Sequence, residues 1–292
     1  MDMPVEGVFH NLVITQIHKE YAGQGQKVMN AMWGAGQMMF NKILVLADEK
    51  ASIRDYRQLA QYVFKNLNPA TDVYFSQGPM DVLDHSCSKL GFGGKMCIDR
   101  TAKAEEEIDA DQYQLRAGAY SALTEAVLTS GFPEIAGANL SLLKQDIPCI
   151  VLAVKKQRPG HIRDLHGQLV KLPAMEGVKM ILYVEHTVDV RDLAIALWRF
   201  CNNLDPRRDH FLTTTASGIE QGKVFACLGL DGTRKTKELD NFQRDWPNII
   251  VADDATIRAV DEKWKDLGLG AFLPSPSLKF KDQLYGEEAV VS

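Results

Sequence analysis

The feature that most constrains this chain is an internal repeat with an offset of 137 residues, the separation between Lys42 and Lys179. Both lysines open a short apolar run of the kind that forms a buried strand. The segments that match in order are residues 12–14 with 149–151, 42–46 with 179–183, 66–69 with 203–206 and, after a shift of five residues, 98–103 with 230–235. Collinear matches of this kind indicate a duplicated structural unit.

The repeat defines an expected domain organisation. The first copy of the module occupies residues 1–104, and residues 105–145 form a connector that we expect to be mainly helical. Residues 146–292 hold the second, divergent copy, followed by a C-terminal helix and a tail.

Within each copy, apolar runs alternate with helical patterns. Strands are expected at residues 11–17, 43–47 and 73–75, and helices at residues 24–40 and 52–67, with a final helix at residues 254–267. Such alternation is typical of a parallel or mixed sheet covered by helices. We therefore predict an α/β fold of two tandem related modules, each a mixed or parallel sheet covered by helices, ending in a helix.

Composition excludes several classes of protein. The chain has 292 residues and a net charge of −5, which argues against nucleic-acid binding, because phosphates are bound by clustered Lys and Arg. Its longest apolar run, residues 147–154, is far shorter than the roughly 20 residues of a membrane-spanning helix. The N-terminus has no signal-peptide pattern. Five scattered cysteines without a CxxC pair predict free buried thiols and a cytoplasmic location.

The histidines are the first candidates for chemistry. His161 and His166, with Asp164 between them, invite a metal hypothesis, but a spacing of five does not place both imidazoles on one helical face. We predict exposed loop histidines instead. His85 follows Asp84 and could act as a general base, although hydrogen bonding within the core is the favoured interpretation.

Two further motifs favour structural roles. Residues 91–95 contain three glycines and a lysine, as in a phosphate-binding loop, but the following Ser or Thr and the strand-to-helix context are missing, which favours a plain turn. Asp55 and Asp192 stand at equivalent positions early in expected helices, where a carboxylate suits the helix dipole. Neither a serine triad nor a Walker loop nor a zinc motif is found, so residue patterns alone stop short of a reaction.

A family resemblance adds to this interpretation. The sequence resembles the C-terminal domain of UbiD-type decarboxylases, the polyprenyl-4-hydroxybenzoate carboxy-lyases. The segments that carry the likeness in the first copy are residues 4–12, 21–24, 28–40, 66–69, 78–85 and 94–99. In the second copy the likeness is fainter, except at residues 228–235. The tail at residues 246–268 resembles the terminal helix of the family, which in relatives packs on a partner subunit.

The resemblance implies a specific chemistry. The family uses prenylated FMN, with a divalent metal and potassium, to decarboxylate aromatic or α,β-unsaturated acids non-oxidatively, as in ubiquinone or menaquinone biosynthesis. The cofactor, the metal and an essential glutamate–arginine–glutamate set belong to a preceding domain that nothing in this chain matches. We therefore expect no catalytic residue, no metal site, no bound cofactor and no turnover by this chain alone. Its expected partners are the N-terminal flavin-binding domain and further copies of itself.

The resemblance also implies a site. The family segments that match Gln37, Met38 and Met39, and the loop that matches Met80 and Asp81, approach the cofactor and the substrate. We expect these five residues to form a wall of the substrate pocket. Flexible, polarizable methionine side chains would suit a bulky aromatic acid.

Three expectations concern the rest of the chain. Ala35 occupies the position at which some relatives have a lysine that helps to hold the cofactor phosphate. The second copy is expected to pack on the first through a pseudo-twofold axis, as two subunits do in single-copy relatives. Two alternative functions stay open: a stand-alone interaction or regulatory module that partners a separate catalytic chain, and an unrelated nucleotide-binding α/β enzyme.

Overall fold

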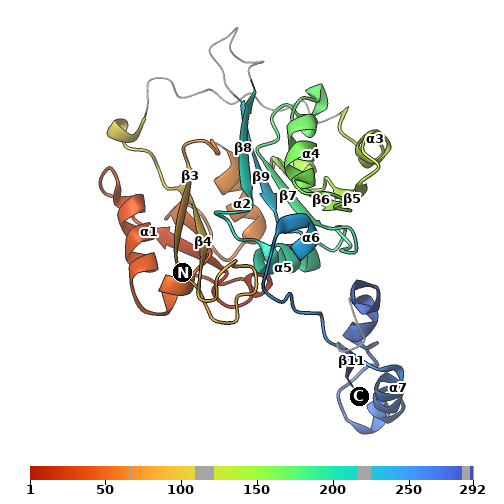
Figure 1. Ribbon diagram of the computed structural model, residues 1–292. Helices are drawn as coiled ribbons and strands as arrows, with labels where there is room; N and C mark the ends of the chain where they lie inside the picture. The colour runs from red at the N-terminus through yellow and green to blue at the C-terminus, as the bar shows by residue number, and fades with distance from the viewer. Residues whose placement is uncertain (66, 109–121, 216–224, 285–289, 292) are drawn as a thin grey trace. The chain divides into compact units, whose positions relative to one another are not determined.

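The computed structural model describes residues 1–65, 67–108, 122–215, 225–284 and 290–291. The chain divides into two compact units, Met1–Arg244 and Asp245–Ser292, of which the first contains both copies of the repeat (Figure 1).

The first copy forms a four-stranded mixed sheet with the order β1-β2-β4-β3 (Figure 1). Its elements are β1 (Leu12–Ile17), α1 (Gln24–Gly34), β2 (Ile43–Asp48), α2 (Tyr56–Lys65), β3 (Val73–Pro79) and β4 (Phe92–Arg100). Strands β1, β2 and β4 are parallel, and β3 pairs with β4 in the antiparallel direction.

The second copy forms a five-stranded mixed sheet with the order β5-β6-β7-β9-β8. Its elements are α3 (Glu125–Gly131), β5 (Ile135–Asn139), β6 (Cys149–Val154), α4 (His161–Leu169), β7 (Met180–Glu185), α5 (Leu193–Asn203), β8 (His210–Thr215), β9 (Phe225–Asp231) and α6 (Lys237–Asp240). Strands β6, β7 and β9 are parallel, as β1, β2 and β4 are in the first copy. The prediction of an α/β fold with two helix-covered mixed sheets is confirmed.

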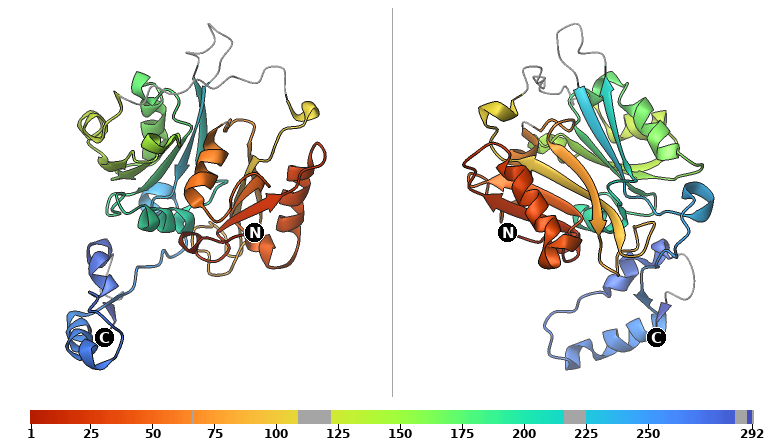
Figure 2. Two further views of the ribbon diagram at one scale, coloured as in Figure 1. Left: turned by 180° about the vertical axis from the view of Figure 1, so that it is seen from behind. Right: turned by 60° about the vertical axis from the view of Figure 1, so that its left-hand side comes forward.

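Each sheet buries both of its faces, which is why its central strands are nearly continuous apolar runs. On the outer face of the first sheet, Val13 and Leu44 pack with Met29 and Trp33 of α1. The inner faces of the two sheets contribute to one common core together with α2 and α5 (Figure 2). Leu67 of the first copy and the equivalent Leu204 of the second copy are both fully buried in this shared core.

Two lysines join the copies by the same contact in opposite directions. The Lys42 ammonium, just before β2, donates to the carbonyl oxygens of Cys201 and Asn202 near the end of α5, at 3.1 and 3.2 Å. The Lys179 ammonium, just before β7, donates to the carbonyl oxygens of the last two residues of α2, at 2.9 and 3.2 Å. A cation is favourable at a helix C-terminus. Reciprocal contacts at equivalent positions are the pattern of a twofold axis, as the sequence repeat predicts.

Several boundaries differ from those expected from the sequence. Helix α1 ends at Gly34, because Ala35 is extended and Gly36 has a φ of 57°, and a short 3-10 helix follows over Gly36–Phe40. The described residues of the connector, which was expected to be mainly helical, form a 3-10 turn at Glu105–Glu107, helix α3 and strand β5, and residues 109–121 lie outside the described residues. The connector thus supplies an edge strand to the second sheet, paired with β6.

The second unit contains β10 (Val251–Ala252), α7 (Asp254–Lys263) and β11 (Val290–Val291), and β10 pairs with β11 in parallel. The final helix is therefore shorter than predicted and continues as a 3-10 turn, Trp264–Asp266. Ile257 is the one buried residue of α7. Among the described residues, no helix combines the length and apolarity that crossing a membrane requires.

Candidate functional site

The 3-10 helix after α1 presents the first set of predicted site residues. Gln37 is exposed, whereas Met38, Met39 and Phe40 are half-buried. The turn exists because the chain leaves α1 through Gly36, whose positive φ a residue with a Cβ rarely adopts. This conformation leaves two thioether side chains partly open to their surroundings.

Lys95 on β4 joins this turn to the second set of predicted site residues. Its ammonium donates to the carbonyl oxygens of Met39 and Asn41, at 2.6 and 2.9 Å, and lies 3.5 Å from Met80 Sδ. The side chain is almost completely buried, and burial lowers the pKa of Lys95 to about 8. The structure therefore brings the two methionine segments together around one buried cation. No sequence signal marked Lys95 for this position.

His10 lies against the same segments. It is buried, with Nε2 3.5 Å from Asp81 Oδ2 and its ring centroid 5.8 Å from that of Phe40. Within the described part of the chain, neither of its ring nitrogens has a hydrogen-bond partner. Burial lowers the pKa of His10, and the Asp81 carboxylate opposes this effect. The preceding residues Val8 and Phe9 have positive φ angles of 41° and 62°, so His10 directly follows a tight turn of the backbone.

The loop after Asp81 is built around a buried ion pair. Asp84 Oδ2 lies 2.6 Å from the Lys42 ammonium, and its Oδ1 accepts hydrogen bonds from the amide and hydroxyl of Ser86. Burial alone would raise the pKa of Asp84, but the Lys42 charge and these hydrogen bonds outweigh it, so the pKa lies below its usual range. His85 Nε2 lies 3.1 Å from Asn203 Oδ1, and burial lowers the pKa of this histidine. The contact agrees with the favoured structural role for His85.

These residues do not fit a flavin phosphate or a divalent metal. The ammonium groups nearest the wall, Lys95 and Lys42, are already occupied by backbone carbonyls and by Asp84, and Ala35 offers no charge. The described residues contain no group of three or more His, Cys, Asp or Glu side chains placed to hold a metal ion.

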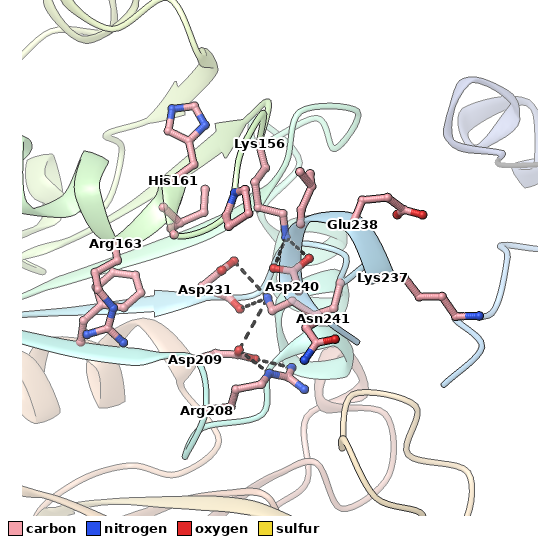
Figure 3. A pocket seen from close by; sticks show the side chains of 16 residues that line it. Lys156, His161, Arg163, Arg208, Asp209, Asp231, Lys237, Glu238, Asp240 and Asn241 are labelled. Carbon is pink, nitrogen blue, oxygen red and sulfur yellow. Dashed lines mark hydrogen bonds and ion pairs between the residues drawn. The ribbon is translucent and has the colours of Figure 1, made fainter. Parts of the chain in front are cut away.

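A polar cavity of about 400 Å³ lies in the second copy, near the carboxyl ends of β6 and β9 (Figure 3). Six of its charged side chains are paired with one another, in the contacts Lys156 with Asp240 at 2.7 Å, Arg208 with Asp209 at 2.7 Å and Lys235 with Asp231 at 3.2 Å. The first copy repeats the scheme, with Lys19 paired to Glu107 and Lys103 to Asp72. A network present in both copies indicates a structural role at this edge of each sheet.

The remaining motifs have structural roles. Residues 92–95 begin strand β4 rather than forming a plain turn or a phosphate loop. Asp55 Oδ1 accepts from the amide of Gln58, and Asp192 Oδ1 accepts from the amide of Ile195. Both aspartates therefore cap α2 and α5 from the position before each helix, which is a structural role, although they were expected inside the helices.

The expectation of exposed loop histidines is wrong. His161 and His166 belong to α4 and are 7% and 1% exposed. His161 Nε2 lies 3.3 Å from Glu134 Oε1, and His166 Nδ1 lies 3.0 Å from the Tyr183 hydroxyl. The apolar side chains of α4 pack on the second sheet and carry both imidazoles into the interior.

The fold is a duplicated α/β module, and its first copy brings Met39 and the buried Met80 together around Lys95. The 3-octaprenyl-4-hydroxybenzoate carboxy-lyase C-terminal domain family matches residues 1–100 and again residues 114–220. The chain therefore belongs to this family, UbiD C-terminal domains, and the resemblance seen in the sequence is confirmed.

The relatives in sequence are longer proteins. Two uncharacterized proteins from strains of Helicobacter pylori are 32% and 31% identical over 253 residues, which cover 84% of this chain and 36% of each relative. An uncharacterized protein of Archaeoglobus fulgidus is 42% identical over 108 residues, or 37% of this chain and 22% of the relative. The chain thus spans about a third of the length of its Helicobacter relatives.

Similar solved structures are UbiD-class decarboxylases. Vanillic acid decarboxylase of Sedimentibacter hydroxybenzoicus in its closed form is 14% identical with a TM-score of 0.39, covering 62% of this chain and 39% of that enzyme. The UbiD-class enzyme HmfF of Pelotomaculum thermopropionicum, in complex with FMN, is 19% identical with a TM-score of 0.31, covering 41% and 26% of the two chains.

Proposed function

We propose that this chain is the C-terminal portion of a UbiD-like non-oxidative decarboxylase of aromatic or unsaturated acids, of the kind that acts in quinone biosynthesis. It covers the active site and mediates oligomer assembly, while an N-terminal flavin-binding domain carries the catalytic residues. The observation that supports this role is the match of the family to residues 1–100 and 114–220, which reaches both copies of the repeat.

The wall is formed by Gln37, Met38, Met39, Met80 and Asp81. Its support is geometric, since one buried ammonium holds the carbonyl of one methionine segment and contacts the thioether of the other. Thioethers adapt to the shape of a large apolar ligand, and a single carboxylate at the edge of such a surface can orient it.

The cofactor of the complete enzyme is prenylated FMN with a divalent metal and potassium, held outside this chain. HmfF has been solved in a complex with prFMN, which supports this assignment for the family. When bound, the flavin supplies the chemistry of CO2 loss. The contribution of this chain is limited to shaping the pocket and excluding water from it.

Two features support assembly and location. The second unit exposes a series of large apolar side chains suited to a protein partner, namely Ile250, Val260, Leu267, Leu269, Phe272, Leu273 and Leu278. All five cysteines are free and buried, as suits a reducing cytoplasm. We infer that the complete enzyme is a cytoplasmic homo-oligomer.

Reconstitution tests the proposal. The chain purified alone should be colourless and should release no CO2 from aromatic acids, whereas the complete decarboxylase should be active.

Replacing Met39 with Ala in the complete enzyme should raise KM for a bulky aromatic acid by roughly tenfold, because the pocket loses apolar contact. Replacing the exposed Met3 with Ala is the matched control. Release of CO2 by the isolated chain would refute the proposal that the catalytic residues lie in the N-terminal domain. Unchanged kinetics of the M39A enzyme would refute the proposal that Met39 lines the substrate pocket.

A further inference from the structure

The loop that carries the wall residues is bound by the second copy. Each of the five consecutive residues 84–88 in the loop between β3 and β4 makes a hydrogen bond to it. The contacts are His85 Nε2 with Asn203 Oδ1 at 3.1 Å, the Ser86 hydroxyl with the Leu204 carbonyl at 3.0 Å, Arg208 Nη1 with the Ser86 carbonyl at 2.7 Å and the Ser88 hydroxyl at 3.2 Å, and Arg244 Nη1 with the Asp84 carbonyl at 3.1 Å and the Cys87 carbonyl at 2.8 Å.

Close approach of the backbones makes these contacts reachable. The amide of Gly94, in the strand that follows the loop, donates to Asp205 Oδ1 at 3.1 Å. A Cβ at this glycine would lie 2.1 Å from the same oxygen, so a larger residue would force the two copies apart. The turn before β8, which contains Asp205 and Arg207, thus packs directly against Gly94, just after the loop.

The same loop fixes the two wall residues at its start. Asp81 accepts hydrogen bonds from the amides of Leu83, through Oδ1 at 2.8 Å, and of Asp84, through its carbonyl at 3.0 Å. The Met80 amide donates to the Gly91 carbonyl at 3.0 Å and closes the loop. Anchoring residues 84–88 therefore limits how far the wall residues can move.

The second copy differs from the first in the segments that match the wall. Its interval between Asp209 and Asp231 is five residues shorter than the equivalent interval in the first copy, which is where this loop lies. Its counterpart of Met38 is Met175, which is buried within a 3-10 turn, Pro173–Met175. Among the described residues, the wall segments belong to the first copy, and the second copy holds the loop that follows them.

We propose that the second copy acts as a built-in positioning partner for the substrate wall, and that Arg208 and Arg244 are the positioning residues. This inference rests on the proposed function. Arg208 suits the task, because Asp209 holds its guanidinium through two hydrogen bonds of 2.7 Å and Phe242 lies beneath it, with 5.3 Å between the guanidinium carbon and the ring centroid. A guanidinium fixed in this way loses little entropy when it binds the loop.

The test combines hydrogen exchange with kinetics in the complete decarboxylase. Arg208→Gln and Arg244→Gln should each accelerate amide exchange at residues 84–88 by about tenfold, while amides of β2 stay protected. Among the residues that the structure describes, Arg244 has no carboxylate partner that its replacement would leave unpaired, so R244Q reports on the loop even where R208Q folds poorly. The matched control is Arg100→Gln, since Arg100 forms a similar pair with Asp72 at 2.8 Å in the first copy.

Kinetics then separates positioning from stability. With the loop loosened, KM for the aromatic acid should rise by roughly fivefold while kcat changes by less than about twofold, and R100Q should change neither. Unchanged exchange at residues 84–88 in both variants would overturn the inference. Faster exchange with unchanged kinetics would leave the anchoring intact and instead refute the placement of the wall at the active site.

Discussion

At the residue scale, His166 shows how burial controls charge in the second copy. Its imidazole is almost completely buried, and burial is the main cause that lowers its pKa to about 4. The positive charge of Arg163 acts in the same direction, and a backbone hydrogen bond to Cys227 opposes it. Native His166 is therefore neutral throughout the range in which an unfolded histidine takes up a proton, near pH 6.5.

This difference predicts an acid-sensitive stability. Between pH 6.5 and pH 4 the unfolded state binds the extra proton, so the free energy of unfolding falls as the pH is lowered through this window. His166→Gln removes the proton site, and the pH-dependent loss between pH 7 and pH 4.5 should shrink by roughly 2 kcal/mol relative to wild type. Urea unfolding at the two pH values measures this. The exposed His186→Gln should retain the wild-type loss, and an H166Q variant that also retains it would contradict the argument.

Single residues also show where sequence reasoning succeeds. The caps Asp55 and Asp192 were predictable, because an aspartate acts on amides only two or three residues away. The burial of His161 and His166 was not predictable, because Pro159 and Gly160 suggest a loop and the imidazoles are enclosed by a sheet that the local sequence does not reveal. The same holds for Lys95, whose contacts lie more than fifty residues away in the chain.

At the scale of elements, the duplicated helices α2 and α5 begin with equivalent caps. Asp192→Ala should lower the free energy of unfolding by about 1 kcal/mol, because the Ile195 amide loses its acceptor. Asp192→Asn keeps a side-chain oxygen and should lose less than half as much. Asp55→Ala should reproduce the effect in the first copy. Chemical denaturation measures all three, and equal stability of D192A and wild type would show that the cap is dispensable.

The strands were the elements most readily predicted. The apolar runs at residues 12–14 of β1 and 43–47 of β2 pack on both faces of the first sheet, so their composition alone identifies them. Strand β5 was missed because Ile135–Asn139 contains Gly137 and pairs irregularly at a sheet edge. The family resemblance selected the two methionine segments, but their contact with the buried Lys95 depends on the pairing of β4 with β3.

At the scale of the whole molecule, the two copies share one core rather than two. Leu67 and Leu204 occupy equivalent positions, just beyond α2 and α5, and both are fully buried in the cluster that includes strands of both sheets. The reciprocal contacts of Lys42 and Lys179 tie the same helix ends across the pseudo-twofold axis. A cavity created by mutation on either side of this axis should therefore destabilise both sheets.

Truncation of either leucine tests this coupling. Leu67→Ala and Leu204→Ala should each destabilise the unit Met1–Arg244 by about 2 to 5 kcal/mol, through lost apolar contact and the cavity left behind. Because the core is common, amide exchange in β2 and β7 should accelerate by similar factors in both variants, as in one cooperative transition. Truncation of the exposed Leu90 to Ala should cost less than about 0.5 kcal/mol. Acceleration confined to β2 in L67A and to β7 in L204A would mean that the copies unfold independently, and a second copy that unfolds independently could not hold the loop of the first.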